Sequence, residues 1–182
     1  MATPQSQPWM RSADPFRRAG KLTDSVYAYV AYRIGSGSTA QDVTSEVILR
    51  AWRRRSTYDP ARGTPESWAI GIARRVLAER SASPETLVDE IPERADPRSE
   101  LGRTLDRITI GQAMQQLGER DRELLALRYG ADLSARQIAR LVDSEVNAVE
   151  VGLSRARSRL RKVLERPARA ERTDHAVLDS GL

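Results

Sequence analysis

Hydrophobic residues recur every three or four positions through most of this chain, a spacing that predicts amphipathic helices. The clearest example lies in the C-terminal third. A short helix is predicted to open at Ser134, a favourable N-cap, and to bury Ile138, Leu141 and Val142. A longer helix follows from a cap at Asn147. It carries one apolar stripe made of Val149, Leu153, Ala156, Leu160 and Val163 or Leu164.

The turn between these two helices is short, and the second helix is basic on its exposed side. The stretch from Asp143 to Val146 is predicted to turn the chain, and an aspartate tolerates the left-handed backbone that a turn can require. Two helices around a tight turn, the second polar and basic, are typical of a helix-turn-helix. Such a motif presents the first turns of its second helix to base edges, while arginines farther along hold phosphates. The competing interpretation is a solvated surface helix that is merely rich in arginine.

The first half of the chain predicts a compact unit of helices. They are expected over about residues 23–34, 39–54 and 64–80. Thr39 resembles the first residue of a capping box, with Asp42 in the place of the usual Glu or Gln. Thr64 is the predicted cap of the third helix, and Pro65 suits its first turn. The positions expected to face the core are Val26, Val30, Ile34, Val43, Val47, Ala51, Ile72, Val76, Trp52 and Trp68.

Prolines and acidic residues without a helical stripe predict a linker in the middle of the chain. Helices are again expected from Ser99 to Leu117 and from Arg120 to Tyr129. The predicted fold is therefore all-α, with a three- to four-helix N-terminal domain and a helix-turn-helix C-terminal domain joined by a flexible linker. The expected boundaries are a disordered tail at 1–20, the first domain at 21–81, the acidic linker at 82–98, the second domain at 99–166 and a disordered tail at 167–182.

Composition narrows the classes of function. The 182 residues include 30 Lys and Arg against 25 Asp and Glu, so the net charge is +5 and an anionic partner such as nucleic acid is favoured. Cysteine is absent and the one histidine, His175, lies in the predicted tail, so we expect no catalytic site, no metal, no cofactor and no small-molecule substrate. No apolar run reaches membrane-spanning length and the start lacks the core of a signal peptide, which predicts a cytoplasmic protein without a membrane partner.

Two stretches of the first half carry a more specific pattern. They are TAQDVTSEVILRAW at 39–52 and YDPARGTPESWAIGIARRVLAER at 58–80. They resemble the second region of the extracytoplasmic-function group of bacterial RNA polymerase sigma factors, where an acidic D-x-x-x-E helix leads to R-A-W, a Y/F-D-x-x-R-G loop and a W-x-x-x-I-A-R helix. Farther along, LGERDRELLALRY and LSRARSRL similarly resemble the family's fourth region. Both occur in the family's order, and the resemblance covers roughly residues 22–165.

The resemblance implies two roles for the first domain. In the family an acidic helix face binds the coiled coil of the polymerase's largest subunit, and a solvated acidic face is the competing interpretation. The residues implied for this contact are Asp42, Ser45, Glu46 and Arg50. In the family the following loop and helix capture a base flipped from the non-template strand. The residues implied for this downstream promoter element are Tyr58, Asp59, Arg62, Thr64, Ser67, Arg74, Arg75 and Arg80.

For the second domain the resemblance implies binding to the upstream promoter element. The implied residues are Arg136, Asn147, Ala148, Glu150, Val151, Ser154, Arg155, Arg157 and Arg159. The chain departs from the family here, because Glu150 stands where a cation is usual and Gly152 where an arginine is usual. Both changes weaken phosphate binding at the front of the helix. Glu150 is instead suited to accept a hydrogen bond from a cytosine amino group.

The predicted function is that of an alternative sigma factor, which binds core RNA polymerase and directs promoter recognition, DNA melting and initiation. The expected partners are core polymerase, promoter DNA and, as for many members of the family, an anti-sigma factor. Bound to polymerase, the protein is expected to associate with the nucleoid. The alternative is a stand-alone helix-turn-helix regulator that binds duplex DNA. That alternative leaves the two patterned stretches of the first half unexplained.

Overall fold

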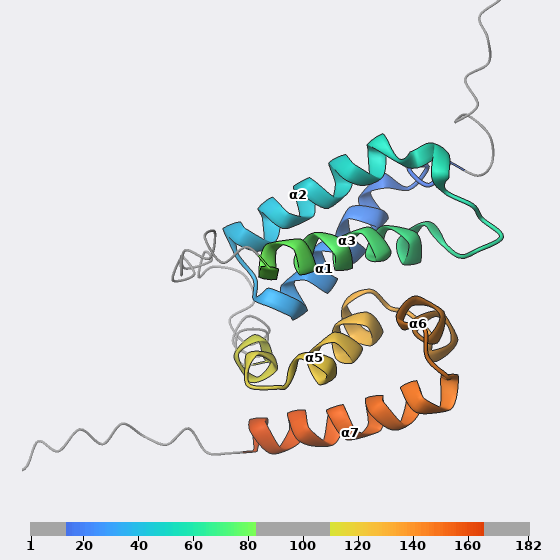
Figure 1. Cartoon of the computed structure of the whole chain (residues 1–182). Helices are drawn as coiled ribbons and strands as arrows, with labels where there is room; N and C mark the ends of the chain where they lie inside the picture. Colours follow the sequence, from blue (N-terminus) through green and yellow to red (C-terminus); the bar gives the residue numbers. More distant parts are fainter. Residues whose placement is uncertain (1–13, 83–109, 166–182) are drawn as a thin grey trace, which may run out of the picture.

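The computed structural model of the chain describes residues 14–82 and 110–165, which are helical with no strand among them (Figure 1). The all-α prediction is therefore confirmed for this part of the chain. Most of the predicted tails, nearly all of the predicted linker and the start of the helix expected from Ser99 lie outside the described residues. None of the described helices is both long and apolar enough to cross a membrane. We call residues 14–82 the N-terminal unit and residues 110–165 the C-terminal unit.

Three α-helices and one turn of 3-10 helix make up the N-terminal unit. They are α1 (Ala19–Ile34), α2 (Ser38–Arg53), η2 (Arg55–Thr57) and α3 (Pro65–Ala82). The predicted core stripes are confirmed at Val26, Val30, Val43, Val47 and Val76, which are each 0% exposed. Burying these side chains supplies the main favourable free energy of the unit, at about 1.5–3 kcal/mol for each large aliphatic group. Ile34, also predicted for the core, is 39% exposed, because it is the last residue of α1.

Some local predictions for this unit were wrong. α1 begins at Ala19 rather than near Thr23, because Leu22 is also buried and extends the apolar stripe by one turn. α2 begins at Ser38 after Gly37, so Thr39 is not its cap. Trp52 is 44% exposed instead of lying in the core. Its ring packs edge-on against Phe16 at 5.1 Å and lies 4.4 Å below the guanidinium of Arg55.

The C-terminal unit contains the helix-turn-helix. Residues 110–115 are helical and precede α5 (Glu119–Leu125), η4 (Ala126–Gly130), α6 (Ala135–Val142) and α7 (Val146–Leu164). The sequence predicted one plain helix from Arg120 to Tyr129. Instead its last turn, η4, is π-helical, and the amide of Ala131 donates to the Ala126 carbonyl at 3.0 Å. A π-helical turn is wider than an α-helical one and changes the direction in which the chain leaves.

Of the two helix caps predicted for the helix-turn-helix, one is confirmed and the other was wrong. Ser134 and Gln137 form the two reciprocal hydrogen bonds of a capping box at the start of α6, which confirms the predicted cap. Asp143 ends α6 in the left-handed region, with φ of 52°, as the turn required. α7 then begins at Val146 with Glu145 as N-cap, so the cap predicted at Asn147 was wrong.

The two units share one hydrophobic core. Tyr29 of α1 and Leu127 of η4 are both 0% exposed and belong to the same buried cluster. A Cβ on Gly130 would lie 2.9 Å from the Ala28 carbonyl oxygen, so only glycine permits η4 to approach the α1 backbone this closely. Figure 1 shows the C-terminal unit stacked beneath the N-terminal unit, with α5 and its continuation below α1 and α3.

Arg122 of α5 binds several backbone carbonyls at the end of helix 110–115, which leads to a first prediction. Its guanidinium donates to the carbonyls of Met114, Gln115 and Leu117 at 2.9–3.1 Å, at and just after the end of helix 110–115. The Met114 carbonyl also accepts from the Leu117 amide at 3.1 Å. Replacing it by methionine keeps the packing but removes all three side-chain hydrogen bonds to these carbonyls. We expect Arg122→Met to lower the free energy of unfolding by about 2–4 kcal/mol, measured by urea denaturation.

The matched control is Arg120→Met, a change of the same kind at an exposed position of the same helix. It is expected to change the free energy of unfolding by less than about 0.5 kcal/mol. Equal losses in the two variants would show that Arg122 stabilises the unit only through its general charge or helix propensity.

Candidate polymerase and nucleic-acid interfaces

One face of α2 presents an acidic and apolar surface to solvent. Asp42 and Ser45 are exposed, as predicted, and Ser45 donates its hydroxyl to the Gln41 carbonyl at 2.9 Å. Leu49 is 49% exposed and lies four residues after Ser45, on the same side of the helix. Leu49 was not predicted for this face, although its spacing of seven from Asp42 was a usable signal. An exposed leucine beside carboxylates suits a protein partner with a basic, partly apolar surface.

Glu46 and Arg50, also predicted for this face, are engaged inside the unit. Glu46 accepts from Arg50 at 2.6 Å and from Arg80 of α3 at 2.9 Å, and Arg50 also binds Glu79 at 2.6 Å. Partial burial raises the pKa of Glu46, but the hydrogen bond from Arg80 and the charges of both arginines together lower that pKa below its ordinary value. This network joins α2 to α3, so Arg80, predicted for DNA, is held by Glu46 in this structure.

The loop between α2 and α3 is fixed by its own side chains. Tyr58 donates its hydroxyl to the Gly63 carbonyl at 3.0 Å, and Asp59 accepts from the Ala61 amide at 2.9 Å. Thr64 caps α3 as predicted, because its hydroxyl oxygen accepts from the Ser67 amide at 3.2 Å. These bonds hold the loop in one shape before any ligand arrives.

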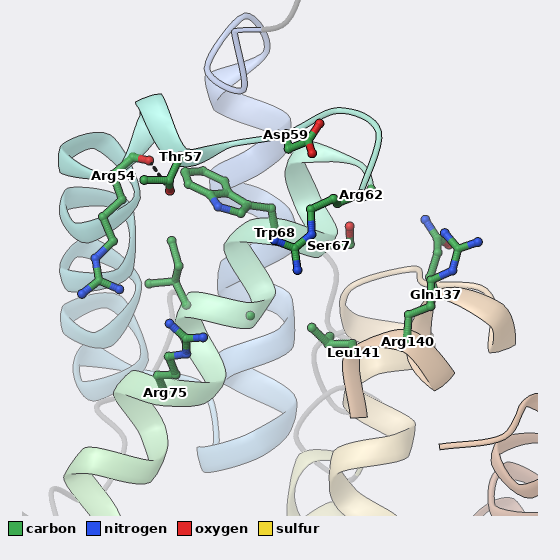
Figure 2. A pocket seen from close by; sticks show the side chains of 13 residues that line it. Arg54, Thr57, Asp59, Arg62, Ser67, Trp68, Arg75, Gln137, Arg140 and Leu141 are labelled. Atoms are coloured by element: carbon green, nitrogen blue, oxygen red, sulfur yellow. Dashed lines mark hydrogen bonds between the residues drawn. The ribbon is translucent and has the colours of Figure 1, made fainter. Parts of the chain in front are cut away.

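Beside this loop lies an open pocket of about 420 Å³, shown in Figure 2. The loop and α3 form most of it, and Figure 2 shows Gln137, Arg140 and Leu141 of α6 facing them. The Trp68 ring lies 5.6 Å from the Tyr58 ring and packs partly on the core, so it serves as both core and pocket wall. The arginines of its lining pair with no carboxylate among the described residues. They are Arg54, Arg62, Arg75 and Arg140.

The chemistry of this lining suits a nucleotide. Unpaired guanidinium groups attract phosphate and stack on bases. Trp68 offers an aromatic wall, and the Asp59 carboxylate offers an acceptor for the edge of a base. Pockets that hold single small ligands measure roughly 300–1,000 Å³, so this one has the dimensions of about one nucleotide and no room for a duplex.

Arg74, predicted to meet DNA beside Arg75, is held elsewhere. Its Nε donates to Glu123 of α5 at 2.6 Å, and another nitrogen donates to the Leu141 carbonyl of α6 at 2.5 Å. Arg75 is exposed and lines the pocket. Two adjacent arginines of α3 therefore differ completely: one is bound to the C-terminal unit, and the other is free for an anion.

The exposed face of α7 carries most of the residues predicted for duplex DNA. Those exposed there are Asn147, Ala148, Glu150, Val151, Ser154, Arg155 and Arg157, and Arg136 of α6 is exposed as well. The front of the helix is uncharged apart from Glu150, and Val151 is 41% exposed. The arginines begin only in its middle. This distribution places hydrogen-bonding and apolar groups at the front and phosphate-binding groups behind.

The side of α7 that faces α5 explains why Gly152 departs from the family's arginine and why Arg159, predicted for DNA, is paired within the unit. A Cβ on Gly152 would lie 2.7 Å from a terminal methyl of Leu124, so Gly152 serves close helix packing. About two turns farther on, Arg159 binds Asp121 of α5 at 2.6 Å. Both positions point about 120–140° around the helix from Asn147, at about 100° per residue, and thus toward α5, although the Arg159 side chain is still 60% exposed. Arg159 is therefore engaged within the unit.

Comparison with known families agrees with this geometry. The model described as Sigma-70 region 2 matches residues 20–82, and the model described as Sigma-70, region 4 matches residues 107–160, together well over half of the chain. The chain belongs to the sigma-70 family. Region 2 coincides with the N-terminal unit, and region 4 contains nearly all of the C-terminal unit.

Similar proteins carry the name of the expected group of sigma factors. The chain is 29% identical to the ECF RNA polymerase sigma factor BldN of Streptomyces coelicolor over 86% of its own length, and it spans 63% of that relative. It is 28% identical to the ECF RNA polymerase sigma factor SigL of Mycobacterium tuberculosis, over 63% of this chain and 68% of SigL. The predicted resemblance to the extracytoplasmic-function group is confirmed.

Solved structures share the fold. The sigma factor RpoE in complex with the anti-sigma factor NepR from Bartonella quintana matches with a TM-score of 0.64 and 17% identity, over 81% of this chain and 94% of that chain. CnrH in complex with the cytosolic domain of CnrY matches with a TM-score of 0.57 and 19% identity, over 81% and 82%. These likenesses establish a sigma-factor fold for both regions.

The packing of sigma region 4 gives a second prediction. Gly152→Arg places a Cβ and a long side chain against Leu124, which must move aside. Overpacking of this kind costs about 1–3 kcal/mol, partly offset by the roughly 1 kcal/mol that helix propensity gains on leaving glycine. We expect a net loss of about 1 kcal/mol in the free energy of unfolding, measured by urea denaturation.

Ser158→Arg is the control, because Ser158 lies on the exposed side of the same helix. It adds the same charge and is expected to leave the free energy of unfolding within about 0.5 kcal/mol of the parent value. A stabilised Gly152→Arg variant would instead show that Leu124 yields without cost.

Proposed function

We propose that this chain is an alternative sigma factor that binds core RNA polymerase and directs promoter recognition, DNA melting and transcription initiation. The observation that supports this most is a nucleotide-sized basic pocket, lined mainly by the loop before α3 and by α3, in the same three-helix unit that carries an acidic, partly apolar face on α2. The pocket suits a single unpaired base, and the face suits a protein. A duplex-binding helix-turn-helix in the same chain supplies a second DNA contact.

The polymerase contact is assigned to the exposed side of α2. Asp42 and Ser45 supply polar contacts, and Leu49 supplies the apolar centre that an interface needs. Glu46 and Arg50 take part less directly, because both are bound to α3 and hold α2 in place. The basic partner expected opposite Asp42 is a surface of the largest polymerase subunit, as the family implies.

Melting is assigned to the pocket beside the loop. A flipped base that stacks on Trp68, with its edge near Asp59, is bound only when it leaves the duplex. Arg62 and Arg75 hold the adjoining phosphates. Binding energy that is available to the unpaired base alone shifts the DNA toward the open state, and no covalent chemistry by the chain is needed.

Upstream recognition is assigned to α7. Asn147, Glu150 and Val151 are positioned to read base edges, while Arg155 and Arg157 hold phosphates behind them. An anti-sigma factor is a further proposed partner. It is suggested by the two similar structures, in which RpoE is bound to the anti-sigma factor NepR and CnrH is bound to the cytosolic domain of CnrY.

A third prediction tests the polymerase-binding face through run-off transcription with bacterial core polymerase and a library of promoter fragments. The parent chain is expected to produce core-dependent, promoter-specific transcripts. Asp42→Arg and Leu49→Asp are each expected to reduce the transcript at limiting protein by at least about tenfold, the equivalent of about 1.4 kcal/mol. Glu46 is a poor target, because its loss also releases Arg50 and Arg80.

Asp24→Arg on α1 makes the same change of charge at an exposed residue outside this face and should leave the transcript unchanged. The proposal fails if the chain forms no complex with core polymerase and yields no transcript. If such a chain nevertheless bound a duplex site tightly, it would be a stand-alone regulator.

A fourth prediction concerns upstream specificity. Glu150→Gln is expected to relax or change the preferred base at one position of the selected duplex, where the parent prefers cytosine by about 1–3 kcal/mol. Arg157→Ala is expected to weaken binding to all duplexes alike and to reduce the salt dependence of binding by about one counterion. Selection from random duplexes followed by anisotropy titration measures both. A base preference that Glu150→Gln leaves intact would contradict the assignment.

A further inference from the structure

We infer that Arg50 of α2 is a positioning residue for the basic pocket: by occupying the Glu79 carboxylate, it leaves Arg75 of α3 free to bind an anion. Arg50 itself is not among the residues that line the pocket. This division of charges follows from contacts within the N-terminal unit alone. Its consequence for DNA, that Arg75 holds a phosphate of the melted strand, rests on the proposed function.

Four charged side chains between α2 and α3 form a balanced set. Arg50 donates to Glu46 and to Glu79, in each case at 2.6 Å, and Arg80 donates to Glu46 at 2.9 Å. Two cations thus meet two anions, and the set carries no net charge. The hydrogen bond to Glu79 is the largest of the effects that raise the pKa of the Arg50 guanidinium. Arg50 is therefore the group that fixes the direction of the Glu79 carboxylate.

Arg75 is the cation that Glu79 would otherwise be expected to bind. The two residues lie four positions apart on α3, which places them about 6 Å apart along the axis and on the same face of the helix. Helical side chains lean toward the N-terminus of their helix, so a glutamate at position 79 can reach the turn that carries Arg75. Both residues are exposed, yet Arg75 pairs with no carboxylate in the described part of the chain.

The competition for Glu79 favours Arg50. An arginine four residues before a glutamate is the less favourable order for an ion pair on one helix. Arg50 instead approaches from a second helix, and its guanidinium makes two short charge-assisted hydrogen bonds at once. The Arg50 side chain is 33% exposed and that of Glu79 is 57% exposed, so water and salt keep their pair modest in strength. One substitution at Arg50 is therefore enough to release Glu79.

A released Glu79 would change what the pocket can bind. Figure 2 shows the Arg75 side chain rising from α3 toward the cavity that Trp68 and Arg62 border. A guanidinium that donates to a carboxylate has fewer N–H groups left for a phosphate. The carboxylate also brings a negative charge that repels the phosphate. Arg50 thus acts on the pocket from another helix, through the carboxylate that it holds away.

The reactivity of Arg75 toward phenylglyoxal tests this role directly, by mass spectrometry of the full chain without DNA or polymerase. The reagent modifies an unpaired guanidinium faster than one that is bound to a carboxylate. We expect Arg50→Met to slow the modification of Arg75 by about two- to fivefold, the range of an exposed ion pair. The double variant Arg50→Met/Glu79→Gln should restore the parent rate, because the released carboxylate is then absent.

Matched comparisons separate this mechanism from a loss of charge or of structure. Arg53→Met removes the same charge from an exposed position of the same helix and should leave the Arg75 rate unchanged. Both Arg50 variants lack the bridge between α2 and α3, so a disturbed structure would alter the Arg75 rate in both alike. Arg140, on the far side of the pocket, gives an internal reference rate in every sample. Circular dichroism checks the helical content of each variant.

Anisotropy titration of the full chain with a short single-stranded oligonucleotide tests the consequence for DNA. Arg50→Met is expected to weaken binding by about two- to fivefold, and Arg50→Met/Glu79→Gln is expected to bind as the parent does. In an Arg75→Gln background, Arg50→Met should cause no further loss. A direct long-range effect of the Arg50 charge would persist in that background and would add independently to the effect of Glu79→Gln.

An Arg75 rate that Arg50→Met leaves unchanged, or a double variant that reacts as slowly as the single one, would overturn the inference. Oligonucleotide binding that is absent from the parent, or that no Arg50 variant changes, would overturn its consequence for DNA. The transcription experiment is separate from both. A chain with the expected reactivities but no initiation refutes the proposed function alone, and a chain that initiates while Arg50→Met leaves the Arg75 rate unchanged refutes only this inference.

Discussion

The close approach of η4 to α1 is the contact on which the rest of this structure depends. Gly130 lies against backbone atoms of Ala28 and Tyr29, at a distance that no other residue permits. The π-helical turn that ends at this glycine directs Leu127 into the shared core and turns the chain toward Leu133 and α6. Because α7 packs on α5 and α6, its position follows from the same contact. One glycine and one wide turn thus place region 4 against region 2.

Ion pairs then divide the many arginines into groups. Arg33, Arg50, Arg74, Arg80 and Arg159 are each bound to a carboxylate and join one helix to another. A second group lines the pocket, and a third lies along α7, without such partners in the described part of the chain. Sequence alone gives all of them the same charge. Only the second and third groups have the free guanidinium that phosphate binding needs. Phosphate is therefore expected to bind at the pocket and along α7, and not at the arginines that are paired with carboxylates.

Local features were predictable from the sequence, and long-range ones were not. The stripes of α1, α2 and α7, the Thr64 and Ser134 caps and the left-handed Asp143 all follow from spacing or from backbone chemistry within a few residues. Trp52 was misplaced because its exposure depends on Phe16 and Arg55, which periodicity does not consider. Gly152 looked like a lost phosphate contact because the approach of Leu124 comes from another helix. The engagement of Glu46, Arg74 and Arg159 has the same origin, since each has a partner that is distant in sequence and on another element.

Arg74 shows why such long-range pairing matters for function. It lies on α3 next to Arg75, where a DNA strand at the pocket needs positive charge, yet Glu123 and the Leu141 carbonyl already satisfy it. A guanidinium bound to these two groups must give them up before it can bind a phosphate. The stronger the internal pair, the less Arg74 contributes to binding DNA. A residue of this type therefore cannot be assigned to stability or to recognition alone. Whatever it adds to the stability of the fold through its internal pair is subtracted from the free energy with which it can bind DNA.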